Sequence, residues 1–343
     1  MRIGQNPAKS IDHVPQPARV TVAVVVYIPF LHGYYAQSLD VLKTCLSSLW
    51  ENTPQPYDLL IFDNASCSEV RSYLQDAQQS GQIQYLLLSD RNVGKGGAWN
   101  MIFQGAPGEI IAYADSDVYF YPGWLESTLK LLEGFPNVGM VTSRPLRTPE
   151  KYATSTLEWA RRTPGVELEQ GQFMSWEIYQ EHTDSLGVAV TQAREWYEST
   201  YDWLIHFGDI SAYAGAAHFQ FVAYKTVLQS VTPFSMDRPM GQVRTLDEKL
   251  NQQGCLRLGT AERLVRHLGN TIDYARSGAA VGDNRLSGQA SPDAPEYNRR
   301  SDLTSFDSTV KRAPRKRLRD FPPIRRSLLW LYDRIFRLYY TQK

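Results

Sequence analysis

Residues 20–28 read VTVAVVVYI, a run of mostly β-branched residues with almost no polar alternation. A strand with one face in water alternates apolar and polar residues, whereas a strand buried on both faces of a parallel sheet is apolar throughout. This stretch therefore predicts the first core strand of an α/β domain.

The chain that follows repeats a helix and a strand several times. Residues 38–50 (SLDVLKTCLSSLW) carry apolar side chains at helical spacing, and Pro54 and Pro56 end that pattern. Further elements follow in the order strand 59–62, helix 70–79, strand 83–88, helix from about 97 and strand 109–114. This alternation predicts a doubly wound, mainly parallel sheet flanked by helices, whose ligands bind outside the carboxyl ends of the strands.

The composition is that of a globular protein, with 343 residues, 43% of them hydrophobic, and 36 basic against 36 acidic side chains. This balance excludes a disordered chain and one that coats nucleic acid. The charge is uneven, because residues 311–343 carry eleven Lys or Arg against two Asp, which makes this tail +9 and the remainder −9. Basic residues beside aromatic ones predict an amphipathic helix there, lying either on an anionic membrane surface or on protein.

Three cysteines, Cys45, Cys67 and Cys255, share no metal-binding spacing, which indicates packing residues in a reducing compartment. Residues 1–19 lack the apolar stretch of a secretory signal, and no run approaches the roughly 18 apolar residues of a spanning helix. We therefore expect a cytoplasmic protein whose membrane contact is at most peripheral, at the inner face of the membrane.

Two carboxylates, Asp115 and Asp117, flank Ser116 at the end of the predicted strand 109–114. Mg²⁺ and Mn²⁺ are hard cations that take one or two carboxylates and share their remaining positions with water and substrate phosphates. A solvated acidic turn is the alternative. The position after a buried strand favours the cation site.

Two further motifs follow predicted strands. Asp63 begins the sequence DNAS, where its carboxylate either accepts from a nucleobase or ribose or caps the next helix through an Asx turn; both alternatives stay open. Residues 91–100 (RNVGKGGAWN) combine glycines, a helix start and Lys95, features that favour phosphate, with an ordinary loop as the alternative. This motif is not a P-loop, because Gly96 follows Lys95 where Ser or Thr is required.

The order of these motifs resembles the family-2 inverting glycosyltransferases of the GT-A fold, over about residues 19–144. The resemblance implies that Asp63 contacts the base, usually uracil or thymine. It also implies that Asp115 lies near the ribose and the metal, and that Asp117 binds the divalent cation, Mn²⁺ or Mg²⁺. The other positions expected at the donor nucleotide are Tyr27, Asn92, Gly94, Lys95, Asn100 and Ser116.

Later segments match that family more loosely. Residues 245–250 (TLDEKL) resemble the helix start that supplies the catalytic base, with the usual Glu-Asp pair appearing as Asp247-Glu248. We expect Asp247 to be the base and keep Glu248 as the second candidate. His267 matches the histidine that often completes the metal site. Residues 214–224 resemble the strand that lines the acceptor cleft, where His218 either contacts acceptor or diphosphate or packs in the core.

The resemblance implies transfer of a sugar from a nucleoside diphosphate, UDP or dTDP favoured, to a hydroxyl of a carbohydrate or lipid-linked acceptor, with inversion. The implied layout is a flexible N-terminus 1–18, a GT-A domain 19–275, a loop-rich linker 276–310 and a basic C-terminal helix 311–343. Within the domain it comprises a nucleotide-sugar-binding half 19–147, a helical insertion 148–210 and an acceptor half 211–275. We expect no nucleic-acid partner.

Two other functions deserve comparison. A sugar-nucleotide pyrophosphorylase would carry a Gly-rich, Arg- and Lys-containing loop after the first strand, where this chain has residues 27–33 (YIPFLHG). A non-catalytic sugar-nucleotide-binding module would be expected to have lost Asp117, Asp247 or His267, and all three are present. Both observations favour the transferase.

Overall fold

The computed structural model describes residues 6–237, 240 and 242–272. All of them lie within Met1–Gly288, the first of two compact units into which the chain divides. The linker expected at 276–310 and the basic helix expected at 311–343 lie outside the described residues, as does the end of the domain expected at 275.

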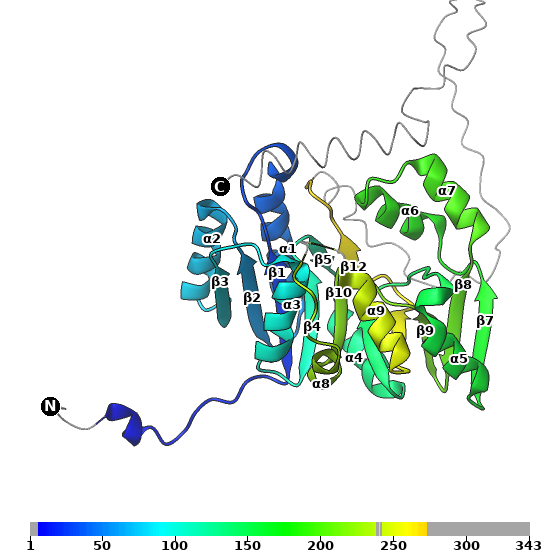
Figure 1. The fold of residues 1–343 in the computed structure, drawn as a ribbon, viewed down its shortest axis with the longest axis horizontal. Helices are drawn as coiled ribbons and strands as arrows, with labels where there is room; N and C mark the ends of the chain where they lie inside the picture. The colour runs from blue at the N-terminus through cyan, green and yellow to red at the C-terminus, as the bar shows by residue number, and fades with distance from the viewer. Residues whose placement is uncertain (1–5, 238–239, 241, 273–343) are drawn as a thin grey trace, which may run out of the picture. The chain divides into compact units, whose positions relative to one another are not determined.

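One large mixed sheet organises the described residues (Figure 1). Its strands are β1 Val20–Val26, β2 Asp58–Asn64, β3 Tyr85–Ser89, β4 Ile110–Asp115, β6 Val138–Thr142, β7 Val166–Gly171, β8 Asp202–Phe207, β9 Ile210–Ala214, β10 Gln220–Tyr224 and β11 Leu256–Thr260. Their order in space is β3-β2-β1-β4-β10-β6-β11-β9-β8-β7, and β10, β9 and β7 run against the other seven. The prediction of a mainly parallel sheet is therefore confirmed.

Helices cover both faces of this sheet. They are α1 Ser38–Asn52, α2 Ser68–Gln79, α3 Gly94–Gly105, α4 Trp124–Gly134, α5 Thr154–Arg162, α6 Trp176–Ser185, α7 Val190–Ser199, α8 Lys225–Ser230 and α9 Gln242–Gln252. Short 3₁₀ turns lie at Pro7–Ser10, Gly33–Tyr35 and Glu150–Tyr152. Alternate residues of β1 enter two separate cores: Val22 and Val24 face the side that α1 and α4 cover, and Ala23 faces the side of α3. The first strand is thus buried on both faces, as its apolar run predicts.

The segment expected as a helical insertion, 148–210, contains α5, α6 and α7 but also two strands. The expectation of a helical insertion is therefore confirmed only in part, because β7 and β8 pair with each other and β8 pairs with β9, which extends the sheet at one edge. The sequence of β7, VELEQG, alternates apolar residues with Glu and has no fully buried position. This period-two pattern of an edge strand was the signal that could have found it.

A buried ion pair anchors the insertion. Arg147, just after β6, bonds both oxygens of Asp202 at the start of β8, at 2.9 and 3.0 Å, and both side chains are almost fully buried. The guanidinium also lies over the rings of Tyr179 in α6 and Tyr197 in α7, 5.3 and 4.5 Å from their centroids. This pair therefore joins the two helices to the strand that follows them.

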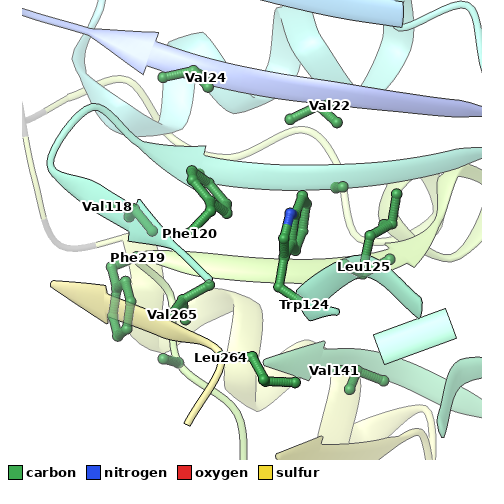
Figure 2. Packing of buried hydrophobic residues seen from close by; sticks show 14 of the residues in the cluster. Val22, Val24, Val118, Phe120, Trp124, Leu125, Val141, Phe219, Leu264 and Val265 are labelled. Atoms are coloured by element: carbon green, nitrogen blue, oxygen red, sulfur yellow. The ribbon is translucent and has the colours of Figure 1, made fainter. Parts of the chain in front are cut away.

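Trp124 lies at the centre of the larger core, as Figure 2 shows, with no exposed surface. Its indole Nε1 donates to Thr53 Oγ1 at 2.9 Å, so the one polar atom of the ring is satisfied.

Trp124→Phe is expected to lower the free energy of unfolding by about 2 kcal/mol, because the buried hydroxyl of Thr53 loses its donor and the smaller ring leaves a void. Urea denaturation measures the difference. The matched control is Trp196→Phe in α7, where the side chain is 45% exposed and little change is expected. Equal losses in the two variants would contradict this account.

Candidate active site

Asp115 ends β4, and both of its carboxylate oxygens have partners in the protein. Lys95 Nζ lies 2.7 Å from Oδ2, and the hydroxyl of Tyr113 donates to Oδ1 at 2.5 Å. Burial, followed by the charge of Asp115, raises the pKa of Tyr113 well above its ordinary value, so this hydroxyl stays a donor. Lys95, predicted as a phosphate ligand, is thus positioned by Asp115 at the carboxyl edge of the sheet.

Asp117 and His267 are 150 residues apart in the chain and meet in the structure. Asp117 lies in the turn between β4 and β5 (Val118–Phe120), and β5 pairs with β12 (Val265–His267). His267 Nε2 lies 3.3 Å from Asp117 Oδ2, and its Nδ1 contacts the hydroxyl of Ser185 at the end of α6, at 2.9 Å. Two of the three residues predicted as metal ligands, Asp117 and His267, are therefore brought together; the third is Asp115.

The hydrogen bonds of His267 leave its Nε2 atom free to bind a cation. The Ser185 hydroxyl donates to the carbonyl of His182 at 2.7 Å, so it accepts from His267 Nδ1–H and leaves the Nε2 lone pair facing Asp117. The Nε2 lone pair of His267 and the carboxylate of Asp117 are both acceptors, so a cation or a proton between them is needed to make their contact favourable. Without a metal a proton serves: burial lowers the pKa of His267, but the charge and hydrogen bond of Asp117 outweigh this, so the pKa is raised.

The fit of a divalent cation can be tested on Asp117 itself. Its Oδ1 is buried and has no hydrogen-bond partner among the described residues, an atom of the kind that a ligand satisfies. No cluster of three or more His, Cys, Asp or Glu surrounds it within that part of the chain, and Asp115 is already engaged by Lys95 and Tyr113. Asp117 and His267 thus fit a cation that takes its other ligands from substrate phosphates and water.

Asp63 lies beneath the turn after β2 and has no exposed surface. Its carboxylate accepts from the backbone N–H of Ser66 at 3.1 Å and from Arg71 Nε at 2.9 Å. Asp63 thus holds this turn and forms an ion pair with α2, but it does not cap the helix, whose N-cap residue is Cys67. Tyr27, at the end of β1, is 37% exposed and lies beside this turn, since the N–H of the next residue, Ile28, donates to Ser66 Oγ.

The loop after β3 is fixed by two asparagines. Asn92 Oδ1 accepts from the N–H of Gly94 at 2.7 Å and from Asn64 Nδ2 at 2.9 Å. Asn100, further along α3, exchanges two hydrogen bonds with the backbone of Phe234. Of the residues predicted at the donor, Asn92 and Gly94 line a hollow of about 1220 Å³ beside β3 and α3, and Asp115 and Asp117 do not.

Asp247 lies in the middle of α9, so the expectation that it stands at a helix start was wrong. Its side chain is 6% exposed, and Oδ1 contacts both His218 Nε2 at 2.7 Å and Arg257 Nη2 at 2.5 Å. Glu248, the second candidate for the base, is exposed to solvent. Arg257 was not identified from the sequence, although an arginine inside the apolar strand β11 (LRLGT) was a signal for a buried charge partner.

Comparison with known proteins adds one decisive observation. Residues 26–189 match the model described as Glycosyl transferase family 2. This segment, slightly less than half of the chain, is similar to that family. The family segment contains Asp63, Asp115 and Asp117, whereas His218 and Asp247 lie beyond it.

An uncharacterized glycosyltransferase of Nostoc sp. is 25% identical to this chain over 100 residues, which are 29% of this chain and 31% of the relative. The match thus spans about a third of that protein. Among solved structures, S. aureus TarS 1–349 is similar with 11% identity over 76% of this chain and 63% of its own, TM-score 0.43. A mannosyltransferase from Pyrobaculum calidifontis in complex with GDP-Man and Mn²⁺ is similar with 17% identity over 73% and 56%, TM-score 0.40.

No helix among the described residues is long and apolar enough to cross a membrane.

Proposed function

We propose that the chain transfers a sugar from a nucleoside diphosphate to an acceptor hydroxyl. The observation that carries this proposal is the meeting of Asp117, in the segment that matches the family-2 model, with His267 at the carboxyl edge of the sheet. Asp117 Oδ2 faces His267, and its Oδ1 is buried without a hydrogen-bond partner among the described residues. We further propose UDP or dTDP as the nucleotide and a carbohydrate or lipid-linked acceptor.

On the donor side, Asp117 and His267 would hold a divalent cation, Mn²⁺ or Mg²⁺. When bound, this cation would neutralise charge on the diphosphate and on the oxygen that leaves the sugar. Lys95 contacts Asp115, which is two residues before Asp117 in the chain. The ammonium group of Lys95 would add a positive charge near the phosphates. The remaining donor contacts that we propose are Tyr27, Asp63, Asn92, Gly94, Asn100 and Ser116, of which Asp63 would act through the turn that it holds.

On the acceptor side, the pair of His218 and Asp247 would remove the proton from the attacking hydroxyl. Attack from the face opposite the leaving diphosphate inverts the anomeric carbon, which is the stereochemistry that we propose. A positioned general base of this kind contributes about 10² to 10⁴ in rate.

A nucleotide screen tests the donor site. In thermal-shift measurements with UDP, dTDP, GDP and CDP, each with Mn²⁺, Mg²⁺ or EDTA, we expect one diphosphate to raise the melting temperature by about 5 °C at a hundredfold excess over Kd. The rise should disappear in EDTA, because the cation bridges protein and phosphates.

Uridine or thymidine with the same metal is the matched control, since each keeps the base and lacks the phosphates. An equal rise with nucleoside alone would place binding at the base rather than at a metal-bridged diphosphate. The absence of any rise with all four diphosphates at millimolar concentration would refute the proposed donor site.

A further inference from the structure

The carboxylate expected to act as base is enclosed by the protein. Asp247 is 6% exposed, and its Oδ1 contacts the buried guanidinium of Arg257 on one side and His218 Nε2 on the other. A general base must come within about 2.6–3.2 Å of the proton that it removes. Arg257 and His218 therefore separate the Asp247 carboxylate from solvent. The side chain of His218 is itself 25% exposed.

We propose that His218 is the general base that contacts the acceptor hydroxyl, and that Asp247 is a positioning residue that acts through it. The proposal rests on the transferase function proposed above and names the group that takes the proton. It assigns Arg257 the task of holding Asp247, because this guanidinium, 1% exposed, contacts Asp247 and also donates to the carbonyl of Ala216 at 2.7 Å.

The hydrogen-bond pattern selects the tautomer. Asp247 is an acceptor, so His218 Nε2 carries the hydrogen, and the lone pair is left on Nδ1. Within the described ranges, Nδ1 makes no hydrogen bond. The acceptor O–H gives its proton to Nδ1 while its oxygen bonds to the anomeric carbon, and the bond from that carbon to the diphosphate oxygen breaks, leaving the electron pair on the diphosphate. The imidazolium that results lies against the Asp247 carboxylate, which stabilises it.

Backbone hydrogen bonds place His218 next to Lys95 and Asp115, two residues predicted at the donor. The carbonyl of His218 accepts from Lys95 Nζ at 3.5 Å, and the carbonyl of Phe219 accepts from the N–H of Asp115 at 2.7 Å. The loop that leads here starts at Gly215, whose φ of 134° is rare for other residues and where a Cβ would meet Thr148 Oγ1 at 2.0 Å. His218 thus lies between Asp115 on the donor side and Asp247 in α9.

The test compares three variants by the nucleoside diphosphate that they release, with water as the acceptor. The donor is whichever of UDP-glucose, UDP-N-acetylglucosamine, dTDP-glucose and GDP-mannose stabilises the wild-type chain most. His218→Gln keeps a nitrogen donor for Asp247 but lacks a basic nitrogen, and we expect kcat to fall at least about 100-fold. Asp247→Asn should lose a similar factor. His206→Gln is the matched control, because His206 also bonds a carboxylate and a hydroxyl, and it should keep full turnover.

Chemical rescue separates a base from a structural residue. Imidazole added to His218→Ala should restore part of the lost kcat, and it should restore nothing in Asp247→Asn, where the ring is still present. Turnover of His218→Gln within threefold of wild type, with Asp247→Asn inactive, would overturn the proposal and return the base to Asp247.

The nucleotide-induced rise in melting temperature reports on folding and donor binding in each variant. If the wild-type chain itself shows neither this rise nor turnover, the transferase function has failed. If the rise persists in His218→Gln together with full turnover, only the assignment of the base has failed.

Discussion

Asp117→Ala is expected to lower the rate of nucleoside diphosphate release from the sugar nucleotide by about 10³, equivalent to about 4 kcal/mol of transition-state stabilisation. The carboxylate supplies the buried oxygen that no described residue satisfies, and it is half of the pair that faces His267. Steady-state kinetics at saturating Mn²⁺ measure this loss. The metal-dependent rise in melting temperature with nucleotide should also disappear.

Asp209→Ala serves as the control, since Asp209 is exposed in the turn between β8 and β9. This variant should match the wild-type chain in rate and in response to EDTA. If Asp117→Ala retained turnover within threefold together with a metal-dependent rise, the cation would have to bind elsewhere.

Asp202→Ala is expected to lower the free energy of unfolding by about 3–5 kcal/mol, which is the usual cost of removing one partner of a buried ion pair. Such a loss is large for a single substitution. Arg147, with its side chain 4% exposed, would be left without its counter-charge. The backbone N–H groups of Phe173 and Met174, which both donate to Asp202 Oδ2 at 2.9 Å, would lose their acceptor. Urea denaturation followed by circular dichroism measures this cost.

Glu198→Ala is the matched control because it removes the carboxylate of another Arg–acid pair, here between exposed side chains on α7. Exposed pairs of this kind contribute about 0.5 kcal/mol or less. A loss below 1 kcal/mol for Asp202→Ala would show that Arg147 finds another partner and that the insertion does not depend on the pair.

The first half of the fold was predictable from the sequence, because β1, β2, β3 and β4 are local apolar runs punctuated by helices and turns. The edge strand β7 and its neighbour β8 were not predicted. Each is stabilised by pairing with a neighbouring strand, and β7 (VELEQG) has no fully buried residue. Strand propensity of this kind depends on tertiary context and leaves a weak local signal.

The candidate site was predictable in part. The meeting of Asp117 with His267 followed from a resemblance, and the structure brings the two side chains together. The partners of these residues were not predictable. Tyr113 and Arg257 lie in apolar strands, where their polar groups contact Asp115 and Asp247, and Ser185 lies in a helix 82 residues before His267. The contact between Ser185 and His267 joins segments far apart in the chain, and no local pattern records it.

Ser185, at the end of α6, forms a hydrogen bond with His267. The same residue packs closely against Gly269, whose φ is 72° and where a Cβ would lie 3.1 Å from the Ser185 carbonyl oxygen. A ligand that shifts α6 while this hydrogen bond is kept would also shift the histidine that faces Asp117. Thermodynamic reciprocity then requires that loading the Asp117 and His267 site changes the affinity for that ligand by the same factor. Through Ser185, the insertion 148–210 is thus in direct contact with the site that we propose for the donor.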